Sequence, residues 1–591
     1  MAISAPSAAE GGPPPRRAGE RTYPVMTRRE IEALIAEGRT IFILDQWVIK
    51  ADAWRRYHPG GDKAIMHMVG RDATDEVNGL HSPEAKRIME RYRIGRIEGR
   101  WKNFLPPIQG GRFRPRVPEG EEEREEEFDP SSALQQESQK GAAEEASSSS
   151  SSRSPSPIFD AADSGLRSRG KPRVSRSASV TSLSSVDDAA AAAAAPKDGM
   201  AHLDVLTRQE IKLDLAKYPP LDPATQDAIV EKYRRLNQRI IDEGLYNCNY
   251  TAYAIEASRY ALFFALMLLF LRWQWYVVSA IFLGCFWHQL VFTAHDAGHM
   301  GITHNFQVDT VIGIIIADFL GGLSLGWWKH NHNVHHIVTN SPEHDPDIEH
   351  MPFFAISHRF LGSLRSTYYE RVMAYDAAAK FFIRLQHHLY YVILLFGRFN
   401  LYRLSWVFLL TGQGPKRGIA AWHRWLEIAG NLFFWTWFGY GLVYRCIPTN
   451  WDRFVFVLVS HFVTTPVHVQ ITLSHFAMST ADLGVNESFP QKMLRTTMDV
   501  DCPEWLDFFH GGLQFQAIHH LFPRIPRHNL RKTQRLVQEF CDEVGIPYAL
   551  YGFVDGNKQV IGRLADVARQ AAILAKCQSV LAKGEAGHHH H

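Results

Sequence analysis

The sequence predicts a multi-domain protein with a small α+β unit at its N-terminus, a low-complexity linker, and an all-α membrane domain. In the membrane domain we expect four transmembrane helices and a histidine-rich cap on one face. The prediction rests on three observations. A strand-like stretch with turn residues comes first, a region rich in Ser, Ala and Glu follows, and the remainder alternates long apolar segments with histidine clusters. At 591 residues the chain is long enough for more than one domain.

Composition excludes several classes of protein. A formal net charge of +2 gives no strong attraction to nucleic acid. The 15 Trp, 20 Tyr and 35 Phe are typical of a protein with aromatic belts at a membrane interface. The 6 cysteines show no CxxC spacing, so neither a disulfide framework nor a zinc knuckle is predicted. The opening MAISAPSAAEGGPPPRR has no apolar core, so we expect no cleavable signal peptide.

The first folded unit carries a strand pair and two histidines beside turns. IFILDQWVIK at 41–50 has the aromatic and β-branched density of two strands. AWRRYHPGGD at 53–62 contains His58, and GRDATDEVNGLHS at 70–82 contains His81. A histidine before a Pro-Gly turn is common on protein surfaces, but the second histidine and the strand pair favour a shared binding site.

These motifs resemble the cytochrome b5 family. HPGG at 58–61 and HS at 81–82 fall at nearly that family's spacing. The resemblance implies a cytochrome b5-like domain over residues 22–103 that binds haem b, with His58 and His81 as the axial ligands. A haem iron with two histidine ligands has no open position, so it passes single electrons rather than binding O₂.

Residues 104–200 are predicted to form a disordered low-complexity linker. They include an acidic run at 121–127, serines at 147–152 and alanines at 189–195. Such composition buries too little apolar surface to offset the entropy lost on folding. The tether would let the haem domain dock on and leave a neighbouring surface. The serine-rich stretch 174–185 is also open to phosphorylation, although it needs no such role.

The membrane domain is expected over residues 201–580. Residues 206–244 have the pattern of an amphipathic cytosolic helix. Four apolar segments that follow are each near the length that crosses about 30 Å of hydrocarbon. These predicted crossings are Ala254–Leu271, Tyr276–Ala294, Trp425–Ile447 and Phe454–His475. The short links RWQW and PTNWDR make each successive pair an antiparallel hairpin.

Three clusters of histidines lie beside these segments: HDAGH at 295–299, HNVHH at 332–336 and QAIHH at 516–520. On a helix, residues three and four apart share a face, so the side chains of each cluster project one way. Imidazoles near lipid are costly without partners, and neutral imidazole is a good ligand for iron, copper, zinc and nickel. The clusters hold more histidines than a single four-coordinate ion needs. They therefore predict a metal centre.

Two further apolar stretches, 308–328 and 389–410, cannot both be crossings if the clusters share that centre. A crossing at 308–328 would put the second cluster on the opposite side from the first. The paired glycines Gly321 and Gly322 weaken this stretch, and Arg398 interrupts the other. We expect both stretches to be re-entrant or interfacial. All the clusters and both termini then share one face.

The clusters resemble the three histidine boxes of membrane fatty-acyl desaturases. An N-terminal cytochrome b5 domain, with Gln516 replacing the first histidine of the third box, is the pattern of the front-end members of that family. By resemblance, the centre holds two non-haem iron ions. The implied iron ligands are His295, His299, His332, His335, His336, His475, His519 and His520. Gln516 is expected either to bind one iron weakly or to order a water.

Other residues near the clusters are expected in supporting roles. Asp296, Asp345 and Asp347 are candidates to accept the second N–H of a ligand imidazole, which fixes its orientation. For Asp345, a simple turn role before Pro346 competes with that interpretation. The remaining neighbouring histidines are expected not to be ligands: His304, His330, His344, His461 and His468.

The resemblance implies an O₂-dependent lipid desaturase that reduces O₂ to water. Zinc has no redox chemistry and is disfavoured as the metal. WWKHNHNVHH at 327–336 and the segment 339–354 look most like fungal Δ8 sphingolipid desaturases, which act on the long-chain base of ceramides. Δ5 or Δ6 acyl-lipid desaturases and lipid hydroxylases are the rival interpretations. An electron carrier without its own substrate would not need the histidine clusters, and a zinc hydrolase would need only three ligands.

The same resemblance gives the partners and the location. Electrons would come from an NADH-cytochrome b5 reductase and pass through the fused haem domain. The expected location is the endoplasmic reticulum membrane, with both termini in the cytosol.

Overall fold

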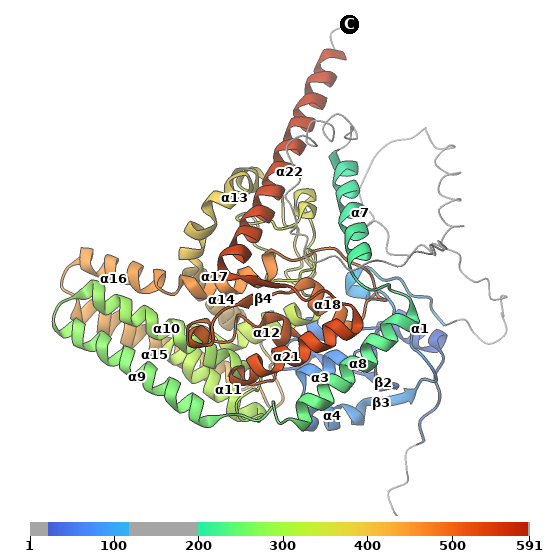
Figure 1. Cartoon of the computed structure of the whole chain (residues 1–591), viewed down its shortest axis with the longest axis horizontal. Helices are drawn as coiled ribbons and strands as arrows, with labels where there is room; N and C mark the ends of the chain where they lie inside the picture. Colours follow the sequence, from blue (N-terminus) through green and yellow to red (C-terminus); the bar gives the residue numbers. More distant parts are fainter. Residues whose placement is uncertain (1–21, 117–198, 589–591) are drawn as a thin grey trace, which may run out of the picture.

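A computed structural model describes residues 22–116 and 199–588 of the chain (Figure 1). Most of the predicted linker, residues 117–198, lies outside these ranges. Its first part does not, and there the predicted boundary is wrong. Residues 104–116 pack on the N-terminal domain because Phe104 contacts Trp101 and Phe113, and Arg114 pairs with Glu32 at 3.1 Å.

The N-terminal domain is a small antiparallel sheet with short helices around it. Its strands are β1 (Ile41–Leu44), β2 (Trp47–Lys50) and β3 (Arg93–Arg96), in the order β1-β2-β3. Its helices are α1 (Arg28–Ala36), η1 (Arg55–Tyr57), α2 (Asp62–Met66), α3 (Thr74–Leu80), α4 (Pro83–Met89), η2 (Glu90–Tyr92) and η3 (Pro107–Gln109). The predicted strand pair is confirmed: β1 and β2 form a hairpin whose turn residues Asp45 and Gln46 are left-handed, with φ of 49° and 65°.

The helical domain starts with two helices where one was predicted. α7 (Gly199–Lys217) ends before Pro219 and Pro220, and α8 (Pro223–Asp242) begins after them. Proline has no N–H to donate within a helix, so the pair divides the expected amphipathic segment. α8 buries Ile229, Tyr233 and Ile240 against the C-terminal helices, which places it on the cap as expected.

The first predicted hairpin is present. α9 (Tyr250–Arg272) and α10 (Tyr276–Gly298) lie side by side, joined through Gln274 at a φ of 63° (Figure 1). Only Met267 of α9 is fully buried, whereas most of α10 is buried inside the protein. α9 therefore presents its apolar surface to lipid, and α10 forms the centre of the domain.

The second hairpin is built from interrupted helices. α15 (His423–Phe434) continues as the π-helix η6 (Trp435–Cys446). The returning segment is α16 (Asn450–Phe462) followed by α17 (Thr465–Phe476), with Pro466 at the break. Within the described residues, three helices are long and apolar enough to cross a membrane (α9, α10, and α16 with α17), or up to five if bent pairs are counted.

The two stretches expected to be re-entrant or interfacial, 308–328 and 389–410, both lie in bent pairs of helices. α11 (Phe306–Ile314) and the π-helix η4 (Ile315–Leu320) turn by 117° into α12 (Leu325–Val338). The bend contains Gly322 at a φ of 71°, a conformation that favours glycine. α13 (Ala377–Leu395) and α14 (Gly397–Thr411) meet at 68°. The first bend turns α12, with the second histidine cluster, back toward the end of α10.

The C-terminal segment completes the cap over these helices. Its elements are α18 (Phe489–Thr496), β4 (Asp499–Asp501), η7 (Glu504–Leu506), α19 (Asp507–His510), α20 (Gln516–Leu521), α21 (Arg527–Val544), β5 (Leu550–Gly552) and α22 (Phe553–His588). A short helix, η5 (His358–Gly362), lies earlier in the chain, between α12 and α13. α8, α20 and α21 share one apolar core, while α22 packs on α13 and α17 and its C-terminal end projects from the domain (Figure 1). This packing holds the short helix α20 beside α12.

Candidate metal centres

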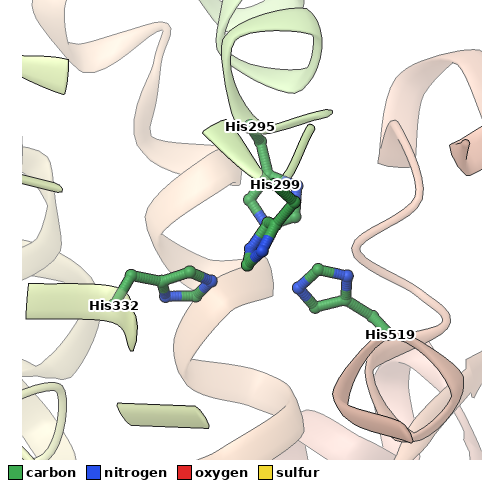
Figure 2. A group of neighbouring side chains, drawn as sticks. All are labelled: His295, His299, His332 and His519. Atoms are coloured by element: carbon green, nitrogen blue, oxygen red, sulfur yellow. The ribbon is translucent and has the colours of Figure 1, made fainter. Parts of the chain in front are cut away.

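The structure brings histidines from all three clusters together. His295 in α10, His299 at its end, His332 in α12 and His519 in α20 each offer a ring nitrogen, and these nitrogens lie within 4.8 Å of one another. Figure 2 shows the four rings close together, with His295 and His299 from the end of α10, His332 from α12 and His519 from α20. One metal ion fits among them.

A second group lies directly beside the first, with the rings of His332 and His335 stacked at 5.4 Å. It joins His335 of α12, His475 of α17 and His520 of α20, again with ligand nitrogens within 4.8 Å. The Nε2 atoms of His335 and His520 are 3.2 Å apart. His475, predicted from its place at the end of a crossing, therefore lies among the cluster histidines rather than apart from them.

His336 lies between the two groups. Its ring centroid is 4.3 Å from that of His520 and 4.8 Å from that of His519, and its Nε2 is 3.1 Å from the Nε2 of His332. Every histidine predicted as an iron ligand is thus found in one continuous cluster, with His336 in contact with members of both groups.

Carboxylates fix the orientation of the α12 histidines. His335 donates from Nδ1 to Asp345 at 2.8 Å, which leaves its Nε2 free to face the centre. Asp345 is fully buried and also accepts from the backbone N–H of Asn340 at 2.7 Å. His332 lies 3.4 Å from Asp347. These contacts agree with the supporting roles predicted for both aspartates.

Asp296 has a different set of partners. It accepts from Arg527 of α21 and from Tyr253 of α9, while His295 Nδ1 is 3.9 Å away. Arg527 also pairs with Glu256, so the network ties α9, α10 and α21 together beside the cluster. Arg527 was not predicted from the sequence, because no local pattern connects it with Asp296 or Glu256, more than 200 residues earlier in the chain.

The other candidate residues lie at the margin of the cluster. Gln516 is buried at the start of α20, one turn before His519. The remaining histidines have separate partners: His304 contacts the carbonyls of Met300 and Tyr246, His330 contacts Tyr368, His344 contacts Thr367, His461 contacts Tyr402, and His468 packs near Gly397. In the described part of the chain none of these five joins either group.

The donor set fits metal ions better than a protein interior. Buried ring nitrogens of His299, His336, His475 and His519 have no hydrogen-bond partner, although buried polar groups normally have one. Burial also lowers the pKa of His519 and His520 well below the usual value, so their rings are neutral and can bind a metal. Two adjacent groups of imidazoles suit two ions of the kind that bind nitrogen ligands.

The N-terminal histidines form a separate pair. His58 donates from Nδ1 to the carbonyl of Gly61 at 2.8 Å, and the Nδ1 of His81 is 3.3 Å from the carbonyl of Val77. Their ring centroids are 5.8 Å apart, and each Nε2 is left available. Burial lowers the pKa of both rings, that of His81 to about 3. Two neutral imidazoles beside an apolar core fit the axial positions of a haem.

Comparison with known proteins agrees with both sites. Residues 271–552 match the fatty acid desaturase family, and residues 27–98 match the cytochrome b5-like heme/steroid binding domain. The chain is 62% identical to a delta 8-(E)-sphingolipid desaturase of Emericella nidulans, covering 96% of this chain and 98% of the relative.

More distant relatives follow the same pattern. A protein of Candida albicans with the same name is 48% identical, covering 94% of this chain and 97% of its own length. An acyl-lipid (9-3)-desaturase of Borago officinalis is 39% identical over 51% of this chain and 66% of its own length. The fused domain, the helical membrane domain and the full-length similarity lead to one conclusion: the chain belongs to the fatty acid desaturase family, as a member with its own cytochrome b5 domain.

Proposed function

We propose that this enzyme introduces a Δ8-(E) double bond into the long-chain base of a sphingolipid, with O₂ reduced to water. The observation that supports it most strongly is the 62% identity, over nearly the whole of both chains, to a relative named for that reaction. The fused cytochrome b5-like domain supplies the electrons.

The geometry supports a set of proposed ligands. His58 and His81 would hold haem b through their Nε2 atoms. The remaining predicted histidines would hold two non-haem irons: His295, His299, His332, His335, His336, His475, His519 and His520. Iron held in this way supplies an O₂-dependent oxidant able to remove hydrogen from an unactivated methylene, which no side-chain acid or base can do.

The chain itself contributes orientation and exclusion of water. Asp345 keeps the His335 Nε2 directed at the centre, and the buried helices α10, α12 and α20 close around it. Gln516 begins the third cluster, one turn before His519 and His520, and would bind water or substrate beside them. A dry, preorganised site keeps the reacting carbon apart from solvent.

The proposed setting is the endoplasmic reticulum membrane, with the cap and both termini in the cytosol. An NADH-cytochrome b5 reductase donates electrons to the haem domain there. Sphingolipid and O₂ are the substrates.

A second candidate is desaturation of an acyl-lipid. It is favoured by the similarity of about half the chain to the Borago protein and to a delta(8)-fatty-acid desaturase of Arabidopsis thaliana, 40% identical over 50% of this chain. A lipid hydroxylase on the same scaffold would differ in product mass, because it adds one oxygen instead of removing two hydrogens.

Expression in a host without Δ8-unsaturated long-chain bases tests the proposal. Mass spectrometry of sphingoid bases and acyl chains should reveal a new base lighter by two hydrogens, with its E double bond at carbon 8. An altered acyl chain with unchanged bases would transfer the proposal to acyl-lipids. A His335→Ala chain expressed in the same host controls for host enzymes.

A further inference from the structure

The N-terminal domain packs directly on the helix that carries the second histidine cluster. α2, which follows the HPGG motif, lies against α12. Ala64 and Ile65 of α2 belong to the same apolar cluster as Val334, Ile337 and Val338 of α12. The two domains therefore share a buried apolar core.

The His58 loop fits against α12 without room for side chains. A Cβ on Gly60 would lie 2.4 Å from the Nδ2 of Asn333, and one on Gly61 would lie 2.6 Å from the His330 ring. Asn333 immediately follows His332, a member of the first ligand group. The glycines thus allow the loop beside one proposed haem ligand to pack against the side chains of His330 and Asn333, which flank a metal-centre histidine on α12.

The His81 loop makes the matching contact on the other side. Arg524 donates from Nη1 to the carbonyl of His81 at 3.0 Å. A Cβ on Gly79 would lie 3.6 Å from the carbonyl of Leu521. Leu521 ends α20, directly after His519 and His520. Both loops that bear haem ligands therefore contact helices that bear metal-centre histidines.

Ion pairs surround this contact. Arg234 of α8 pairs with Asp75 of α3 at 2.8 Å, and Arg100 pairs with Asp227 at 2.8 Å. Lys63 pairs with Glu370. Exposed pairs contribute little to stability, but opposite charges around an apolar contact set the orientation in which two surfaces meet.

We propose that the His58 loop and the His81 loop form the surface by which the N-terminal domain docks on the catalytic domain. On the catalytic domain, Asn333 contacts the first loop and Arg524 contacts the second. This docking role rests on the proposed function. With haem and iron bound, this contact would let one electron pass between the domains, so that the haem would be oxidised from ferrous to ferric and one iron of the cluster reduced from ferric to ferrous. A flavoprotein reductase then returns the haem to the ferrous state.

Disulfide trapping tests the docked position without reference to activity. A Cβ at Gly60 lies 3.3 Å from Asn333 Cγ, which brings the two Cβ atoms near the separation of about 3.5–4.5 Å that a disulfide needs. In the full chain with haem and iron bound, the pair Gly60→Cys with Asn333→Cys should cross-link under mild oxidation. The pair Glu37→Cys with Asn333→Cys should not, because Glu37 is exposed at the end of α1 whereas Gly60 is buried against Asn333. Absence of the first cross-link, or equal cross-linking of both pairs, would overturn the proposal.

Charge reversal tests the consequence for electron transfer. Arg234→Asp places two carboxylates together and should slow reoxidation of pre-reduced haem, in the presence of O₂ and substrate, about tenfold, equivalent to about 1.4 kcal/mol of docking free energy. Haem and iron contents should stay unchanged. Adding Asp75→Arg restores the opposite charges and should recover most of the rate. Unchanged reoxidation in Arg234→Asp would reject the docking role.

The two proposals fail separately. Product without the Gly60–Asn333 cross-link would reject the docking surface and leave the enzymatic function standing. The cross-link without a Δ8 product would support the docking surface and reject the proposed substrate.

Discussion

The N-terminal pair and the catalytic cluster are both made of histidines, but the residues that contact these histidines lie at very different separations along the chain. His58 and His81 are each oriented by a carbonyl within four residues, that of Gly61 and that of Val77. In the cluster, His335 faces His520, 185 residues away. The first site depends on local turns, whereas the second depends on how α10, α12, α17 and α20 pack.

Because of this difference, we expect the two sites to respond differently to substitutions elsewhere in the chain. A locally built site tolerates alterations elsewhere in the protein. A site assembled from four helices depends on contacts that hold those helices, such as the network of Arg527, Asp296 and Glu256. The histidine cluster assembled from these helices is buried from water. It also has carboxylates, such as Asp345 and Asp347, that hold its rings in place.

Removing a cluster ligand should have the largest effect. In His335→Ala the centre loses a ligand in contact with His475 and His520, so we expect iron and desaturation to be lost together. Haem should be retained, because the N-terminal pair does not depend on α12 for its ligands. Metal analysis, the haem absorbance spectrum and product mass spectrometry measure the three quantities. An active, iron-free protein would contradict the assignment.

Removing a proposed haem ligand should have the opposite result: haem should be lost while the non-haem iron is kept. His58→Ala should lose haem but keep its non-haem iron, and desaturation should fall to the level that external cytochrome b5 supports. Assay with and without added cytochrome b5 gives the comparison. Full activity without any added carrier would show that the fused domain is not the electron donor.

Local patterns predicted much of this architecture. The hairpin at 41–50, the helical hairpin around Gln274 and the histidine clusters all have short-range signals, and each was found. His475 was predicted from its position at the end of a crossing, together with the resemblance, and it lies in the cluster.

Features that were predicted wrongly or not at all are those determined by tertiary packing or by an interruption of a helix. The predicted helix over 206–244 ignores the pair Pro219–Pro220, which separates α7 from α8. Phe104 and Phe113 lie just beyond the predicted domain boundary, and only their burial reveals that they belong to it. Arg524 and Asn333 carry no motif of their own, because their meaning comes from a domain that lies hundreds of residues earlier in the chain.

Weakening a supporting carboxylate should have a smaller effect than losing a ligand. Asp345→Asn keeps the shape of the side chain but replaces the charged carboxylate that accepts from His335 Nδ1 with a neutral amide. We therefore expect iron affinity or activity to fall about 10- to 100-fold. Asp347→Asn is the matched control, since its contact with His332 is longer, at 3.4 Å, and its effect should be weaker. Iron titration of both variants tests this order. Equal losses would show that the short contact to Asp345 has no special role.

The smallest effect should come from Gln516, the one position where the third cluster departs from histidine. A neutral amide oxygen is a weaker donor than imidazole, and the surrounding groups already hold enough nitrogens for two ions. We therefore expect Gln516→Ala to keep its iron and lower turnover between about twofold and tenfold, the range expected for one lost hydrogen bond. If the iron content instead fell by half, Gln516 would be a ligand, and the cluster would depend on oxygen as well as nitrogen. Gln516→His is the informative partner variant: it should keep iron in both cases, so a loss of turnover there would locate the role of Gln516 in ordering water or substrate beside the centre.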